Sequence, residues 1–291
     1  MSIQSQVFVF GEVLFDSFPS GEEVLGGAPF NIAWHLQAFG DQPQFISRIG
    51  DDLLGKKITT AITGWGMVTS NIQYDDRHKT GRVKVNVIDN EPHYDIVANC
   101  AYDFIDSDAV KLYNSSGILY HGSLALRNDC SRHALMQLAQ NPNMSIFLDV
   151  NLRSPWWEKQ HIETWLDHAR WVKLNIDELA LLGFNITDLK SAMEALQSQF
   201  QLEQVIVTCG PQGAIVLSEQ RQFHQVIPQA PESFIDTVGA GDAFTAIYIH
   251  GLLSGWSILH TLELAQQFAC KVIGLRGAVS TDSAFYRNFI D

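Results

Sequence analysis

The second half of the chain alternates short apolar runs with stretches of helical periodicity. Apolar runs occupy residues 117–120, 145–149, 171–175 and 204–208, and a helical stretch near 130–140 separates the first two. This alternation predicts β–α–β units, whose right-handed crossovers build a mostly parallel sheet flanked by helices. We therefore expect an α/β fold whose functional side chains gather at the carboxyl ends of the strands, where such sheets bind ligands.

Both ends of the chain extend this pattern. Residues 6–10 and 44–49 are expected to form buried strands, and apolar side chains at helical spacing predict a helix over 30–39, with Pro29 in its first turn. Towards the C-terminus, the pattern predicts a strand within 222–231, a helix over 242–253 and a second, long helix over 257–276.

Residues 79–97 differ from the rest of the chain, because polar and apolar side chains alternate there around a series of valines. Pro92 is expected to break the run. One polar and one apolar face are typical of a half-exposed antiparallel hairpin. We expect this hairpin to join the mixed segment 12–25 in a small β-sheet lid, made of about residues 12–25 and 79–100, with an ordinary edge hairpin as the alternative.

Composition limits the possible partners. The chain has 291 residues, of which 46% are apolar and 18% charged, enough for a sizeable core. A net charge of -13 argues against nucleic acid or an anionic membrane as a partner. No apolar run reaches membrane length, the first residues lack a basic signal-peptide region, and the four cysteines form no Cys-x-x-Cys pair. We expect a reduced, cytoplasmic protein.

The most informative stretch is DTVGAGDAF at 236–244. Gly239, Ala240 and Gly241 leave the backbone uncrowded, so that successive N–H groups can turn towards one anion. The helix that follows adds the positive end of its dipole. Asp242, in its first turn, is placed to accept a proton from a hydroxyl beside that anion, as phosphoryl transfer to an alcohol requires. A tight turn before an ordinary helix start is the alternative.

Residues 50–57, GDDLLGKK, approach the pattern of a phosphate-binding P-loop. Lys57 stands where that loop needs a magnesium-binding hydroxyl, and Asp51 and Asp52 would repel a phosphate. We therefore reject a P-loop and interpret Gly50 to Gly55 as a turn from a strand to a helix.

Three further motifs follow predicted strands. In DVNLR at 149–153, Arg153 can bind sugar oxygens or phosphate, or can form a surface pair with Asp149. Asn175 and Glu178 can close a capping box at a helix start. The stretch 208–213, TCGPQG, suits contact with nucleotide phosphates or an ordinary hairpin turn.

The strings GEVLFD at 11–16, GGAPFN at 26–31 and DTVGAGDAF at 236–244 together resemble the two signatures of the ribokinase-like (PfkB) sugar kinases. The resemblance spans essentially the whole chain, since GxDxxG, NxxE and TxGxxG elements lie between them in the family's order. DVNLR resembles the DPNLR motif of fructokinases, with Val150 in place of the proline. The resemblance implies a single ribokinase-like kinase domain over residues 1–291, whose lid closes over the substrate and mediates a homodimer.

The resemblance also assigns roles. Asp242 is the catalytic base, with the backbone of Gly239, Ala240 and Gly241 as the anion hole. The groups that it implies for the sugar are Asp16, Gly26, Gly27, Asn31 and Arg153. For ATP and its Mg²⁺ it implies Asn175, Glu178 (through water), Thr208, Gly210, Gly213, Thr237 and Gly277. The adenine pocket borrows residues such as Ala269 and Val272, and Asp236 and Gly277 lie near a monovalent cation such as K⁺.

The expected function is therefore transfer of the γ-phosphate of MgATP to a primary hydroxyl of a monosaccharide. Fructose is the preferred substrate, because DVNLR and the segments 91–96 and 102–104 look most like fructokinase. Ribose, 2-keto-3-deoxygluconate and nucleosides stay open. A non-catalytic sugar sensor would not need Asp242, Asn175 and Glu178 together, and a hydride-transferring Rossmann enzyme is disfavoured because no GxGxxG follows the first strand.

Overall fold

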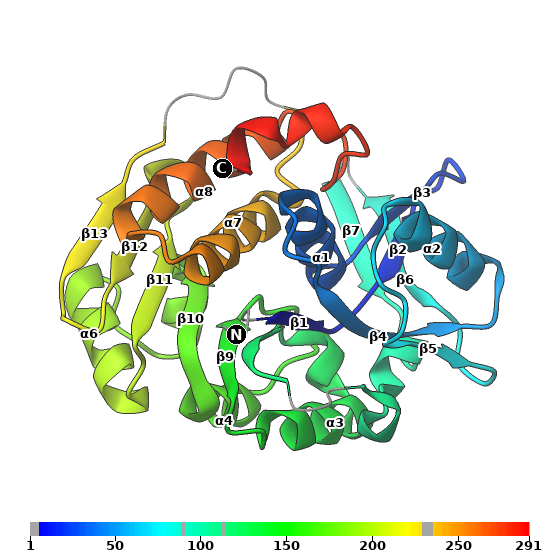
Figure 1. The fold of residues 1–291 in the computed structure, drawn as a ribbon, viewed down its shortest axis with the longest axis horizontal. Helices are drawn as coiled ribbons and strands as arrows, with labels where there is room; N and C mark the ends of the chain where they lie inside the picture. Colours follow the sequence, from blue (N-terminus) through cyan, green and yellow to red (C-terminus); the bar gives the residue numbers. More distant parts are fainter. Residues whose placement is uncertain (1–5, 89–90, 112–114, 229–234, 291) are drawn as a thin grey trace.

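Nine strands form the central sheet of the computed structural model, which describes residues 6–88, 91–111, 115–228 and 235–290. They are β1 (Gln6–Phe10), β4 (Gln44–Gly50), β5 (Ile72–Asp75), β8 (Gly117–His121), β9 (Met144–Asp149), β10 (Ala169–Asn175), β11 (Gln204–Thr208), β12 (Ala214–Leu217) and β13 (Phe223–Val226). Their order is β13-β12-β11-β10-β9-β8-β1-β4-β5 (Figure 1). Neighbours from β11 to β5 pair in parallel, and β12 and β13 add antiparallel edge strands. The predicted mostly parallel sheet is confirmed.

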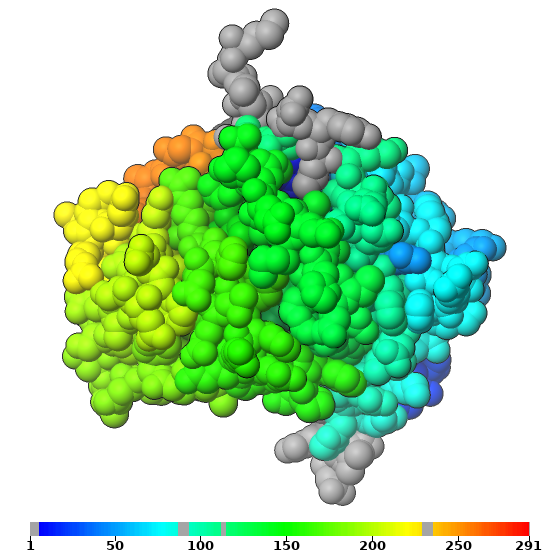
Figure 2. All heavy atoms as spheres, turned by 90° about the horizontal axis from the view of Figure 1, so that it is seen from below, coloured from blue at the N-terminus to red at the C-terminus, as the bar shows by residue number. Residues whose placement is uncertain are grey.

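Helices cover both faces of this sheet. On one face lie α1 (Ala28–Phe39), α2 (Leu53–Gly64), α7 (Ala240–Ser254) and α8 (Ile258–Val272). On the other lie α3 (Asp129–Ala139), α4 (Lys159–His168), α5 (Ile176–Leu181) and α6 (Leu189–Phe200). Figure 2 shows this second face, with the green segment that includes α3 and α4 covering its middle. No helix in the described residues is both long and apolar enough to cross a membrane.

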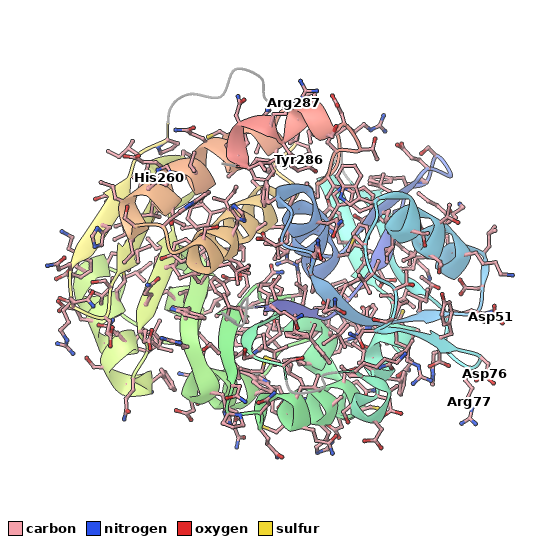
Figure 3. The ribbon with its side chains drawn as sticks, viewed as in Figure 1. Asp51, Asp76, Arg77, His260, Tyr286 and Arg287 are labelled. Carbon is pink, nitrogen blue, oxygen red and sulfur yellow. The ribbon has the colours of Figure 1, made fainter. Side chains whose placement is uncertain are left out.

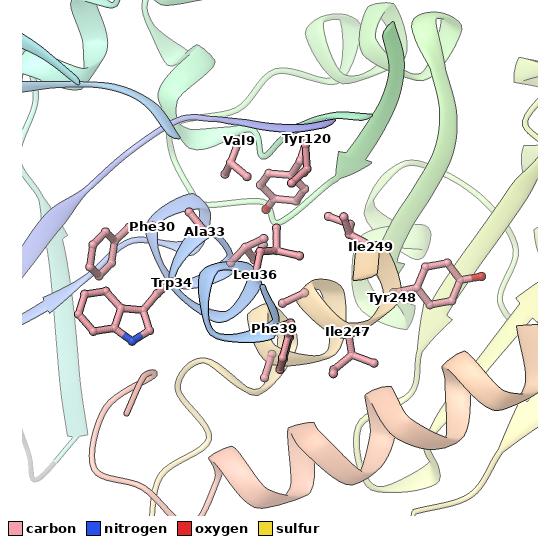
Figure 4. Close-up of a cluster of buried hydrophobic side chains, with 14 of the residues drawn as sticks. Val9, Phe30, Ala33, Trp34, Leu36, Phe39, Tyr120, Ile247, Tyr248 and Ile249 are labelled. Atoms are coloured by element: carbon pink, nitrogen blue, oxygen red, sulfur yellow. The ribbon is translucent and has the colours of Figure 1, made fainter. Parts of the chain in front are cut away.

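The apolar strand side chains divide between the two faces, since successive residues of a strand point to opposite sides. Val7 and Val9 of β1 pack in the cluster of α1 and α7, whereas Phe8 and Phe10 pack in the cluster of the opposite helices. Figure 4 shows Val9 and Tyr120 facing α1 and α7, with α8 beyond them. Two buried cores therefore hold the sheet and fix the positions of the α1 and α7 N-termini.

A second, smaller sheet has four strands, drawn from the two segments that were expected to form the lid. Its order is β3-β2-β6-β7, built from β2 (Leu14–Ser17), β3 (Glu23–Gly26), β6 (Gly81–Ile88) and β7 (Glu91–Ile96). The predicted antiparallel hairpin is confirmed by the pairing of β6 with β7. The expectation that Pro92 interrupts the run is wrong, because Pro92 lies within β7, opposite Val87. As β7 is an edge strand, the missing N–H of a proline is tolerated there.

The long helix predicted over 257–276 is shorter than expected, because α8 ends at Val272. A helix continuing to residue 276 would use the Ile273 carbonyl for an N–H four residues later. That carbonyl instead accepts hydrogen bonds from the N–H groups of Ile235 (2.9 Å) and Asp236 (3.1 Å). The end of α8 thus anchors the segment that leads into α7.

Short 3₁₀ helices complete the described residues. They are η1 (Ala101–Phe104), η2 (Ser107–Ala109), η3 (Leu124–Arg127), η4 (Gly210–Gln212), η5 (Ser283–Phe285) and η6 (Arg287–Phe289).

Candidate active site

Asp242 and Asn31 meet at the adjacent N-termini of α7 and α1. The Asn31 side-chain amide donates a hydrogen bond of 2.8 Å from Nδ2 to Asp242 Oδ2. The candidate base and a candidate sugar ligand, 211 residues apart in the sequence, therefore lie in one site. This contact occupies one carboxylate oxygen of Asp242, and within the described residues the other oxygen has no hydrogen bond.

The pKa of Asp242 is raised above its ordinary value, chiefly because its carboxylate is buried. The hydrogen bond from Asn31 and the positive charges of Lys173 and Arg153 favour the ionised form, whereas the Asp149 carboxylate opposes it. A carboxylate with a raised pKa is a better proton acceptor, provided that it stays ionised at the working pH.

Backbone geometry at the start of α7 fits an anion. Gly239 has φ 82°, and a Cβ on it would lie 2.6 Å from Ala278 Cα, so that only glycine fits. The Ala240 N–H turns back to the Thr237 carbonyl at 3.3 Å. Within the described residues, the N–H groups of Gly239 and Gly241 donate no backbone hydrogen bond. Two of the three predicted anion-hole donors are therefore available.

A buried lysine that sequence reasoning missed lies directly beside this anion hole. Lys173 Nζ is 3.0 and 3.1 Å from the two Asp149 carboxylate oxygens, and a Cβ on Gly241 would lie 3.3 Å from it. The Thr245 hydroxyl is within hydrogen-bonding distance of both Asp149 Oδ2 (3.0 Å) and the Gly241 carbonyl (2.9 Å). The signal was a lysine within the stretch 171–174 of β10, whose other residues are apolar.

The pKa of Lys173 is raised even though burial alone would lower it, because the carboxylates of Asp149, Glu178 and Asp242 favour the ammonium form. Lys173 therefore supplies a fixed positive charge beside the anion hole.

Arg153 interacts electrostatically with Asp242 and does not form the surface pair with Asp149. The alternative pairing with Asp149 is wrong, since Lys173 already occupies that carboxylate. Arg153 Nη1 donates to the Leu152 carbonyl at 3.0 Å, and its charge acts on both Asp242 and Glu12. Within the described residues, its guanidinium forms no ion pair.

Asp16 in β2 and Asp236, shortly before α7, interact electrostatically. Burial raises the pKa of Asp16 to about 6, and the charge of Asp236 raises it further. Gly26 ends β3 beside Asp16, and Gly27 precedes α1 with φ 111°. A Cβ on Gly27 would lie 2.8 Å from the Glu12 carbonyl, which explains the glycine at this position.

Asn175 and Glu178 form the predicted capping box of α5. Asn175 Oδ1 accepts from the Glu178 N–H, and Glu178 Oε2 accepts from the Asn175 N–H, both at 2.8 Å. Glu178 Oε1 accepts from the Leu152 N–H at 2.8 Å, so this carboxylate also holds the DVNLR segment. Burial raises the pKa of Glu178, whereas these N–H hydrogen bonds and the positive charge of Lys173 lower it in part.

The remaining candidate nucleotide residues lie at two turns. Thr208 ends β11, and Gly210 and Gly213 lie in the hairpin turn to β12, where the Cys209 N–H donates to the Gly213 carbonyl at 2.7 Å. Thr237 shortly precedes α7, and Gly277 shortly follows the end of α8. Val272 and Ala269, two candidates for an adenine pocket, are both buried in the cluster of α1, α7 and α8.

The rejected P-loop is an ordinary turn. β4 ends at Gly50 and α2 begins at Leu53, where Asp52 caps the helix by accepting from the Gly55 N–H at 2.9 Å. Figure 3 places Asp51 at the edge of the molecule, near Asp76 and Arg77 beside β5.

Comparison with known proteins agrees with this geometry. The sequence matches the model of the pfkB family carbohydrate kinases over residues 10–284. The fructokinase of Salmonella typhimurium is 26% identical, with 96% of each chain covered. The structure of Vibrio cholerae O395 fructokinase in its fructose, ADP and calcium ion bound form superposes with a TM-score of 0.86, at 22% identity and 100% coverage of both chains.

A second solved structure has the same fold. Aminoimidazole riboside kinase from Salmonella enterica, complexed with aminoimidazole riboside and an ATP analog, gives a TM-score of 0.86 at 21% identity, covering 99% of this chain and 100% of that one. The family match extends over nearly the whole chain, and the chain belongs to the pfkB family of carbohydrate kinases.

Proposed function

We propose that this carbohydrate kinase transfers the γ-phosphate of MgATP to a primary hydroxyl of a monosaccharide, with fructose as the substrate. The observation that carries the proposal is the contact between Asn31 and Asp242 at the N-terminus of α7. It joins a proton acceptor, a group suited to sugar hydroxyls and an anion-binding helix end in one site.

In this mechanism Asp242 takes the proton of the primary hydroxyl while its oxygen attacks the γ-phosphate. Asn31 fixes Oδ2 of the carboxylate, so that Oδ1 faces the hydroxyl. The N–H groups of Gly239 and Gly241 and the ammonium of Lys173 stabilise the negative charge that spreads over the transferred phosphoryl group. Such preorganised donors act more strongly in a site that excludes water.

The sugar is held between the lid and the sheet. Asp16, Asn31 and Arg153 would bind its hydroxyls, with Gly26 and Gly27 allowing close approach of the backbone. With a pKa of about 6, Asp16 is ionised at neutral pH and accepts hydrogen bonds from two hydroxyls of a polyol.

Thr208, Gly210, Gly213, Thr237 and Gly277 would hold the nucleotide. The described residues contain no group of three His, Cys, Asp or Glu side chains that could hold a metal. This fits Mg²⁺, which keeps most of its waters and binds phosphate oxygens, with Glu178 reached through water. When bound, Mg²⁺ neutralises phosphate charge.

K⁺ near Asp236 is a further part of the proposal. Relatives from Vibrio cholerae O395 are described with fructose and ADP together with a calcium ion in one structure and a potassium ion in another.

Fructose is favoured over other sugars by the fructokinase relatives from Salmonella typhimurium and Escherichia coli, at 26% and 25% identity. Two residues of the fructokinase-like segment 102–104 make contacts within the protein. Tyr102 is buried, and Asp103 holds Arg127 through bonds of 2.7 and 2.8 Å. A nucleoside substrate stays the second candidate, because the aminoimidazole riboside kinase has an equal TM-score.

The test is ATP turnover by the purified protein with Mg²⁺, against fructose, ribose, 2-keto-3-deoxygluconate, glucose and adenosine. Turnover strongest on fructose supports the full proposal. If turnover is strongest on another compound of this panel, the proposed mechanism stands and that compound replaces fructose as the proposed substrate. Saturable sugar binding without turnover of any member would contradict the proposal and favour a sensor.

We also propose that residues 1–291 act as one kinase domain. The lid is tied to α2 by the ion pair of Lys57 Nζ with Glu23 Oε2 at 2.7 Å, and Arg127 Nη2 donates to the Val97 carbonyl at 2.6 Å. A homodimer through the lid and a cytoplasmic location stay predictions.

A further inference from the structure

Glu12, in the loop between β1 and β2, is a buried acid. It is 3% exposed, and within the described residues its Oε2 has no hydrogen-bond partner and no cation forms an ion pair with it. The other buried acids are all compensated: Asp75 by Arg48, Asp103 by Arg127, Asp149 by Lys173, and Glu178 by two backbone N–H groups. An ionised carboxylate buried in this way is unfavourable, so burial favours the protonated form of Glu12.

Five groups, four from named elements and one from the loop after β9, interact electrostatically with Glu12. Arg127 from η3, Tyr102 from η1 and Tyr120 from β8 interact with it electrostatically, as do Arg153 after β9 and Asp242 in α7. We call Glu12, Tyr102, Tyr120 and Arg127 the Glu12 cluster. Each has a buried polar atom without a partner in the described part of the chain: Glu12 Oε2, the two tyrosine hydroxyls and Arg127 Nη1.

The balance of charges in the Glu12 cluster favours a neutral Glu12. The charge of Arg127 is already compensated, since Asp103 accepts two of its hydrogen bonds. Burial raises the pKa of Glu12 to about 7, and the Asp242 charge adds to this effect. Its own backbone N–H, Arg153 and Arg127 lower the pKa only in part.

We propose that Glu12 is a positioning residue that carries its proton in the working enzyme, so that Asp242 faces a neutral neighbour and Arg153 stays free for the substrate. This inference rests on the proposed function. Two interacting acids titrate as a pair, so loss of the Glu12 proton places a second negative charge beside the base. That charge attracts Arg153 and repels the incoming phosphate. Activity therefore falls when Glu12 ionises.

The direct test compares pH profiles of kcat/KM for the wild type, Glu12→Gln, Glu12→Ala and Glu219→Gln. Glutamine is a permanent mimic of the neutral acid, and the exposed Glu219 serves as the matched control. For the wild type and Glu219→Gln, we expect kcat/KM to decline above about pH 7, approaching tenfold for each pH unit. This decline is expected to be absent in Glu12→Gln, and Glu12→Ala is expected to be impaired at every pH. An unchanged decline in Glu12→Gln, or equal impairment of both Glu12 variants, would overturn the proposal.

A second measurement does not depend on turnover. Infrared spectra of the wild type at pH 6 should contain a carbonyl band of a protonated carboxyl that is absent from Glu12→Gln and present in Glu219→Gln. Absence of such a difference would show Glu12 to be ionised and would overturn the proposal. If the wild type phosphorylates no sugar, the proposed function fails, while this spectroscopic result still decides the protonation state of Glu12.

Discussion

Asn31 of α1 donates a hydrogen bond of 2.8 Å to Asp242 of α7. This contact links two parts of the chain that are 211 residues apart at the candidate active site. α1 and α7 lie side by side over the sheet (Figures 1 and 4), packed in one buried cluster. Since an amide donor stabilises an ionised carboxylate, Asn31 sets both the orientation and the charge of the candidate base. The packing of the two helices is thereby linked to proton transfer.

Replacing Asn31 by alanine should shift the acid limb of the pH–rate profile upwards. Loss of a hydrogen bond to a charged group costs about 1.5–3 kcal/mol, which corresponds to a rise of about one to two pH units in the pKa of Asp242. We expect a higher KM for the sugar as well. Gln37→Ala is the matched control, since Gln37 lies on the same helix and donates to Gly66. An acid limb that does not move in Asn31→Ala would contradict this role.

Lys173→Met should impair both stability and catalysis. Removal of the ammonium leaves Asp149 buried without its cation, which costs about 3–5 kcal/mol in the free energy of unfolding. The double variant Lys173→Met with Asp149→Asn should regain stability but not kcat, because the charge beside the anion hole is still missing. Denaturant unfolding and kcat separate the two effects, with the exposed Lys159→Met as control. Recovery of kcat in the double variant would show that Lys173 is only structural.

Gly239→Ala should weaken phosphate binding at the start of α7. An alanine at φ 82° is strained, and its Cβ would collide with Ala278, so that the N–H groups of this turn are displaced. We expect a higher KM for ATP and a loss of about 1–3 kcal/mol in stability. Gly64→Ala is the control, since a Cβ there meets nothing within 4 Å. Wild-type KM for ATP in Gly239→Ala would argue against the anion hole.

Glu12→Gln should stabilise the protein at neutral pH and not at acidic pH. Glu12 binds its proton more tightly when folded, with a pKa raised from 4.5 to about 7. The stability that this proton contributes is therefore complete below pH 4.5 and is lost as the pH rises to about 7, a loss of about 3 kcal/mol. Glutamine does not titrate and avoids this loss. Urea unfolding of the wild type and Glu12→Gln at pH 5 and pH 7.5 checks this prediction. A difference in the free energy of unfolding that is the same at both pH values would contradict it.

Much of the fold was predictable from local pattern. The strands 6–10 and 204–208 were predicted with the bounds that the structure has, because their apolar runs are short and flanked by polar or glycine residues. The end of α8 was not predictable, since it depends on a carbonyl of Ile273 that residues 235 and 236 occupy from elsewhere in the chain. Pro92 was misjudged because its tolerance depends on β7 being an edge strand.

Some residues of the candidate site could be found from the sequence, and others only from the structure. Asp242, Asn31 and Glu178 were found because they lie in short motifs, although only the structure brings the first two together. Lys173 and Glu12 were missed because their significance lies in burial and in the charges around them, which come from elements distant in sequence. A charged residue within an apolar strand, as in WVKLN, is the sequence signal for such a group.

The role of Asp242 as the base is tested by single-turnover transfer of γ-phosphate to fructose by Asp242→Asn, with fructose binding measured in the same preparation. We expect Asp242→Asn to fold and bind fructose while the transfer rate falls about a hundred- to ten-thousand-fold, because asparagine cannot accept the hydroxyl proton. Asp177→Asn, at the exposed first turn of α5, serves as control and should transfer at the wild-type rate. Transfer by Asp242→Asn at a near wild-type rate would contradict the central claim that this carboxylate is the base.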